Sequence, residues 1–117
     1  MCSSDLASLL AATSACAARY TVHPGALNKT DSAAYDMLLV AETAIDQARL
    51  AFKSGQLPDG AKPALDALVR SYNLARDSWL TYRDAIASNR PAARYLGELN
   101  RNLTDLATAI RSFEESK

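Results

Sequence analysis

The sequence LGELNRNLTDLATAIRSF, residues 96–113, decides the fold class of this chain. Its large apolar residues recur at spacings that alternate between three and four, which is the heptad pattern of an amphipathic helix packed against other helices. No segment of the chain alternates apolar and polar residues with period two for long enough to indicate a strand. The apolar seam of this predicted helix consists of Leu96, Leu99, Leu103, Leu106, Ile110 and Phe113.

Two earlier segments repeat the same pattern. We expect one helix to begin near Thr30 or Asp31, either of which can cap it, and to end before Gly55, a residue suited to a left-handed helix end. A second helix is expected from about Lys62, with Pro63 tolerated in its first turn. The seam residues are Ala34, Leu38, Ala41, Ile45, Ala48 and Phe52 in the first of these helices, and Leu65, Leu68, Tyr72, Ala75, Trp79, Tyr82 and Ile86 in the second.

Short connections set the predicted topology. Residues 56–60 contain Pro-Asp-Gly, and residues 88–90 are long enough only for a reversal, after which Pro91 is expected to open the last helix. Helices joined by short loops are antiparallel neighbours. The sequence therefore predicts an all-α, up-down-up antiparallel three-helix bundle over residues 31–117. A long helical hairpin that dimerises into a larger bundle is the competing interpretation.

Composition limits the classes of function. The 117 residues suffice for one domain, and 13 basic residues balance 13 acidic ones. The linear sequence contains no basic run, so we expect no binding to nucleic acid. No stretch is apolar for the roughly 20 residues that a membrane-spanning helix needs.

The first eighteen residues have the pattern of a secretion signal. Residues 6–15 are apolar and small, like the hydrophobic region of a signal peptide, although residues 1–5 lack the usual basic start. Residues 2–6, Cys-Ser-Ser-Asp-Leu, resemble a translated sequencing adapter, and we interpret residues 1–5 as non-native. Residues 19–30 have no helical period and contain the turn signal His23-Pro24-Gly25, which indicates an extended tether to the bundle.

The end of the apolar segment resembles the lipobox of bacterial lipoproteins. Ser14, Ala15 and Cys16 match the family pattern, whereas Thr13 stands where leucine is usual. The resemblance implies lipidation of Cys16 and a lipid anchor in a bacterial membrane. Cleavage at the A-x-A pattern of residues 15–17, releasing a soluble protein, remains an alternative. So does a short amphipathic helix over residues 5–18 that belongs to the fold.

Residues able to perform chemistry are sparse. The single histidine, His23, lies beside a turn and is expected to be solvated, and no cofactor motif or metal-ligand spacing is present. Asp77 and Asp84 share one face of the second helix with Arg76 and Arg83, which indicates a solvated charged stripe. Tyr72, Trp79 and Tyr82 could form an aromatic ligand cage. Because all three lie on the seam, we expect them to be core residues instead. We therefore expect no catalytic site, no metal site and no cofactor.

Apolar residues outside the seams give the one candidate surface. Leu39 and Val40 point outward beside the seam of the first helix, and Leu74 and Leu80 lie outside the seam of the second. Either the tether near Tyr20 covers them, or they form a surface for self-association or a protein partner. The sequence thus favours a non-catalytic, lipid-anchored binding or structural module of the cell envelope. The first alternative is a soluble secreted or periplasmic helical protein that acts as a homodimer, and the third and most distant is an enzyme.

Overall fold

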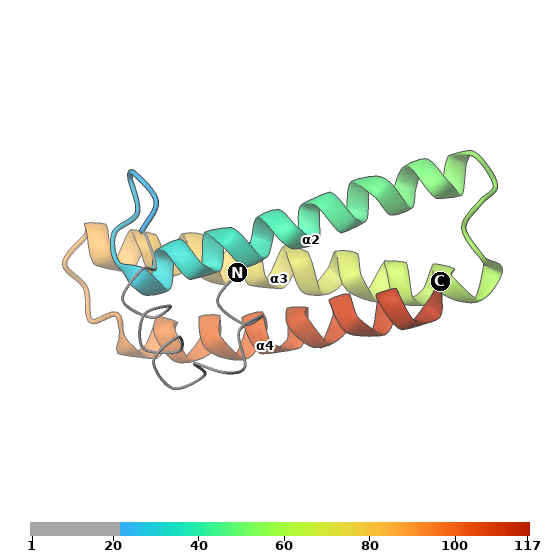
Figure 1. Cartoon of the computed structure of the whole chain (residues 1–117). Helices are drawn as coiled ribbons and strands as arrows, with labels where there is room; N and C mark the ends of the chain where they lie inside the picture. Colours follow the sequence, from blue (N-terminus) through green and yellow to red (C-terminus); the bar gives the residue numbers. More distant parts are fainter. Residues whose placement is uncertain (1–21) are drawn as a thin grey trace, which may run out of the picture.

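A computed structural model describes residues 22–117 and shows three long helices. Helix α2 spans Lys29–Lys53, α3 spans Lys62–Ala87 and α4 spans Ala93–Ser116, with a short 3-10 turn, η2, at Asp59–Ala61. They run up, down and up, so the predicted three-helix bundle is confirmed (Figure 1). The described residues contain no strand. The signal-like helix predicted before the tether lies outside them.

The start of α2 differs from the prediction. Asn28, in extended conformation with φ of −167°, is the N-cap, and its side chain accepts a hydrogen bond from the backbone amide of Asp31. Thr30 and Asp31 are therefore within the helix, and the expectation that one of them caps it was wrong. The reason is that Asn28, two positions before Thr30 in the chain, already accepts a hydrogen bond from a free amide of the first turn. Asp31 is then free to face the bundle.

The other helix ends follow mostly from backbone preferences. Gly55 adopts φ of +74° after α2, and a proline lies in the first turn of α3, both as predicted. Pro91 does not open α4, which begins at Ala93. The reversal is longer because Asn89 takes φ of +57° and the amide of Arg90 still bonds to the carbonyl of Ala85 in α3.

The three seams form the core. Every predicted seam residue in α3 and α4 is buried or half-buried, and Leu68, Leu99 and Leu106 have no exposed surface. Phe52 is the exception, since 56% of its surface is exposed. Helix α2 lies against α3 at its N-terminal end and diverges from it toward Lys53 (Figure 1), which removes the last seam position from the core.

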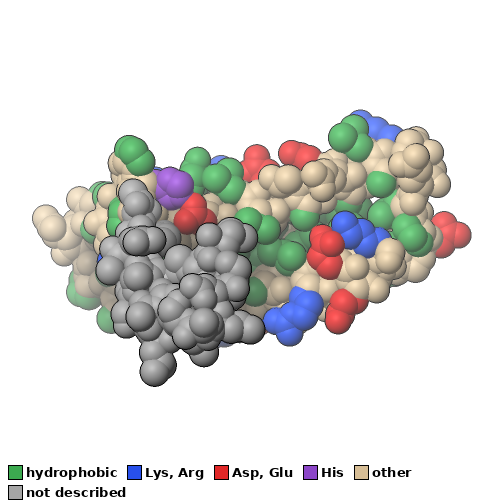
Figure 2. All heavy atoms as spheres, in the orientation of Figure 1, with side chains coloured by type: hydrophobic (Ala, Val, Ile, Leu, Met, Phe, Trp, Pro, Cys, Tyr) green, Lys and Arg blue, Asp and Glu red, His purple; other side chains and the backbone are tan. Residues whose placement is uncertain are grey.

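The divergence of α2 gives the bundle two unlike ends. The start of α2, the end of α3 and the start of α4 meet at one end, whereas the turn from α2 to α3 lies at the other (Figure 1). In the space-filling view, hydrophobic side chains are visible between α2 and the neighbouring helices (Figure 2). Among the described helices, none combines the length and the hydrophobicity needed to span a membrane.

Core packing gives the first testable prediction. Replacing Leu106, which is fully buried between the helices, with alanine should lower the free energy of unfolding by about 2–5 kcal/mol, because it leaves a cavity. Replacing Leu74, which is 59% exposed, should change it by no more than about 0.5 kcal/mol. Urea denaturation of the two variants measures the difference, and equal losses would contradict the packing described here.

Candidate functional site

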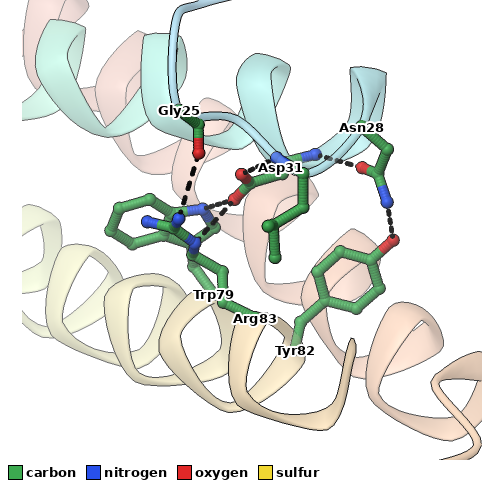
Figure 3. A network of polar contacts seen from close by, with 7 residues as sticks. Gly25, Asn28, Asp31, Trp79, Tyr82 and Arg83 are labelled. Atoms are coloured by element: carbon green, nitrogen blue, oxygen red, sulfur yellow. Dashed lines mark hydrogen bonds and ion pairs between the residues drawn. The ribbon is translucent and has the colours of Figure 1, made fainter. Parts of the chain in front are cut away.

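The first turn of α2 places a buried carboxylate between three segments of the chain (Figure 3). Asp31 is only 2% exposed. Its Oδ1 atom accepts a hydrogen bond of 2.6 Å from the indole Nε1 of Trp79, and its Oδ2 atom accepts one of 2.8 Å from the backbone amide of Leu27. The Nε atom of Arg83 lies 3.5 Å from the same Oδ1. A buried carboxylate needs such partners, because removing it from water is costly.

Two further side chains join the preceding loop to α3. The side-chain amide of Asn28 accepts from the amide of Asp31 and donates to the hydroxyl of Tyr82 over 3.0 Å (Figure 3). Arg83 donates to the carbonyl oxygen of Gly25 over 3.3 Å, and its guanidinium lies 5.3 Å from the centre of the Trp79 ring. Together these contacts fasten residues 22–28 to the end of the bundle.

His23 takes part in the same attachment. Its backbone amide donates to the hydroxyl of Ser32, its Nε2 atom contacts a carboxylate oxygen of Asp36, and its ring meets the ring of Tyr35 edge to face at 5.0 Å. The expectation of a simply solvated histidine was therefore incomplete, although the side chain is 40% exposed. Residues 22–28 form a turn that packs on the bundle, where the sequence had indicated an extended tether.

A pocket of about 540 Å³ lies between this loop and the helices. Residues 23–26 line one wall, and Asp31, Tyr35, Trp79 and Arg83 line the rest. Both carboxylate oxygens of Asp31 already accept hydrogen bonds, and across residues 22–117 every buried side-chain polar atom has a partner. The polar groups are thus satisfied by one another, which suits a structural junction better than proton transfer.

The three aromatic residues of the possible ligand cage bond to different partners. The hydroxyl of Tyr72 bonds to Glu42, whereas Trp79 bonds to Asp31 and Tyr82 to Asn28. Burial, followed by the charge of Glu42, raises the pKa of Tyr72. In the part of the chain that the structure describes, no group of three or more potential metal ligands is brought together.

Arg83 was wrongly assigned to a solvated charged stripe. It turns toward Asp31 and Trp79, while Asp84 pairs with Arg90 at the exposed end of α3. Trp79 and Arg83 are four residues apart on one helix, and this spacing was the available signal for a stacked pair. The buried position of Asp31 had no comparable signal, because an aspartate in a first helical turn is usually solvated.

The predicted surface residues are exposed but dispersed. Leu39 and Val40 are 42% and 58% exposed on α2, and Leu74 and Leu80 are 59% and 41% exposed on α3. Residues six apart on a helix are separated by about 120° around its axis, so Leu74 and Leu80 do not share a face. The lipidation candidate, Cys16, lies outside the described residues.

Val40 alone of these four lines a described groove. This groove, of about 410 Å³, lies between α2 and α4, with Met37 beside Val40 on α2 and Ala107 and Ile110 on α4. Leu39 precedes Val40 on the adjoining surface of α2. The candidate interaction surface is thus reduced to Leu39, Val40 and this apolar groove.

The junction at Asp31 is tested by a double-mutant cycle. Asp31→Ala should lower the free energy of unfolding by about 1–3 kcal/mol for each buried donor that loses its acceptor, chiefly Trp79 Nε1 and the amide of Leu27. In a Trp79→Phe background the same change should cost less, because one of those donors is already gone. Asp77→Ala, at an exposed position, is the control. Additive losses for Asp31 and Trp79 would show that they do not interact.

Comparison of the chain with protein-family models, with curated proteins and with solved structures found no match. No relative therefore indicates an activity, a substrate or a partner. What the chain can do is inferred from its own residues: a bundle whose loop is fastened at one end, an apolar groove between α2 and α4, and the sequence that precedes Val22.

Proposed function

We propose that this chain is a non-catalytic lipoprotein of the bacterial cell envelope, in which the three-helix bundle is a small binding or structural module. The anchoring part of the proposal rests on sequence. An apolar segment over residues 6–15 is followed directly by Cys16, and its last two residues, Ser14 and Ala15, resemble a lipobox together with this cysteine. A diacylated or triacylated cysteine would supply the two or more chains that stable membrane attachment requires.

The fastened loop gives such an anchor a defined attachment point. Cys16 precedes Val22, the first described residue, by six positions, and residues 22–28 are bonded to α2 and α3. A lipid at Cys16 would therefore hold the Asp31 end of the bundle near the membrane. The turn between α2 and α3 would project away from it, since it lies at the other end of the bundle (Figure 1).

The observation that carries the binding role is the apolar groove beside Val40. Met37, Val40 and Ile110 present hydrophobic surface between two helices, and Leu39, the neighbour of Val40 in the chain, is 42% exposed. Contiguous apolar surface on a small domain is typical of an interaction site. A non-catalytic role is supported by the Asp31 junction, where the converging polar groups bond to one another.

Anchoring at Cys16 is tested in bacteria with residues 1–5 replaced by a basic signal-peptide start. The protein should fractionate with membranes and incorporate labelled fatty acid. Cys16→Ser should abolish the label, whereas Thr13→Leu, which completes the lipobox, should retain it. Wild-type protein found wholly in the soluble fraction and without label would replace lipidation with simple secretion.

The surface beside Val40 is tested by sedimentation of the full chain over a range of concentrations. If the groove mediates self-association, the double variant Leu39→Gln, Val40→Thr should dissociate while its free energy of unfolding changes by about 0.5 kcal/mol or less. Leu74→Gln, Leu80→Thr on α3 is the matched control and should leave association unchanged. A wild-type monomer at every concentration would refute self-association through this groove.

A further inference from the structure

A second groove lies at the opposite end of the bundle from the Asp31 junction. It has a volume of about 440 Å³ and is bordered by the last turns of α2 and the first turns of α3. Leu65, which is buried, and Val69, which is half-buried, form its apolar floor. Phe52, displaced from the core by the divergence of α2, contributes an aromatic ring that is 56% exposed.

Basic side chains surround this apolar floor. Arg49 and Lys53 come from α2, Lys62 and Arg70 come from α3, and Asp66 is the single acidic residue that lines the groove. The linear sequence contains no basic run, so the local excess of positive charge arises only because the turn between α2 and α3 brings two helix segments together. The chain as a whole has equal numbers of acidic and basic residues, so the excess of positive charge is confined to this groove.

Most of this positive charge is not neutralised by neighbours. Lys62 donates to Asp66 over 2.7 Å, and its ammonium lies 5.9 Å from the centre of the Phe52 ring. Within residues 22–117, the other three basic residues of the groove, Arg49, Lys53 and Arg70, form no ion pair. The groove therefore offers guanidinium and ammonium donors next to hydrophobic surface.

The charge changes sign along α2. The adjoining hollow, toward the middle of the bundle, shares Arg49 and Val69 with this groove and adds the acidic side chains of Glu42 and Asp46. A long polyanion such as a nucleic acid would meet these acids, and a flat membrane surface would not reach the floor of a groove between two helices. A small molecule with one anionic group matches the short basic section better.

We propose that this groove binds a free amphiphile with a single anionic head group, such as a carboxylate. The head group is held by Arg49, Lys53 and Arg70, and the hydrocarbon or aryl tail lies on Phe52, Leu65 and Val69. The volume of this groove, which combines charged side chains with an apolar floor, lies in the range of small-molecule sites. The proposal goes beyond the envelope function and is independent of lipidation at Cys16 and of the groove beside Val40.

The test titrates octanoate into the full 117-residue chain and follows binding by calorimetry and by amide chemical shifts. Octanoate should bind saturably, with the shifts concentrated in residues 49–53 and 62–70. The neutral analogue 1-octanol should bind about tenfold more weakly, because it cannot pair with the basic groups. Raising the salt concentration from about 0.02 M to about 0.3 M should weaken octanoate binding, since these charges are partly exposed.

Variants at exposed positions separate binding from folding. The double variant Arg49→Gln, Arg70→Gln should raise the dissociation constant for octanoate about tenfold. Phe52→Ser should also weaken binding of octanoate. Two controls change exposed residues that do not line the groove: the double variant Arg76→Gln, Arg101→Gln matches the arginine variant, and Leu50→Ser matches Phe52→Ser. Both should leave the dissociation constant unchanged.

Several results would overturn the proposal. These are equal affinity for octanoate and 1-octanol, shifts centred on Val40 instead of the basic groove, or an unchanged constant in the arginine variant. Binding to phosphatidylglycerol vesicles without binding to free octanoate would identify a membrane-contact surface instead.

Discussion

The buried carboxylate of Asp31 determines how the helices are arranged at the end of the bundle where α2 begins. A carboxylate that is 2% exposed must find donors, and its three donors come from two segments: Leu27 in the loop, and Trp79 and Arg83 on α3. Trp79 also packs in the core. Its indole can therefore bond to Asp31 only if the first turn of α2 lies next to Trp79 along the axis of α3. Polar bonding and apolar packing thus set one geometry together.

The far end of α2 lacks such a constraint, and its side chains are arranged differently. Helix α2 diverges from α3 there, and Phe52 moves from an expected core position to the surface. Near the junction, polar groups satisfy one another. At the turn between α2 and α3, the basic residues Arg49, Lys53 and Arg70 form no ion pair within the described residues and lie beside apolar surface. The two ends are therefore suited to different roles, attachment at the first and recognition at the second.

The heptad seams predicted the fold because burial of apolar surface dominates helix packing, and Leu99 and Leu106 lie where the spacing placed them. Spacing along one helix cannot reveal contacts between segments far apart in the chain. It therefore missed the ion pair of Arg83 with Asp31 of α2. It also missed the basic groove, whose residues lie on either side of a turn. Phe52 was wrongly assigned to the core because a heptad pattern assumes that two helices stay at a constant distance. Helix α2 instead diverges from α3 before it reaches Phe52.

The central claim is that the chain before α2 is fastened to the bundle through the buried carboxylate of Asp31. Amide hydrogen exchange at Leu27 tests it most directly, because this amide lies outside the helix and donates to Asp31. The account predicts that the Leu27 amide is protected from exchange like the amide of Ser32, which bonds to the carbonyl of Asn28, and that Asp31→Ala selectively removes the protection of Leu27. Exchange of the Leu27 amide at the rate of an unstructured peptide, while α3 and α4 stay protected, would contradict it.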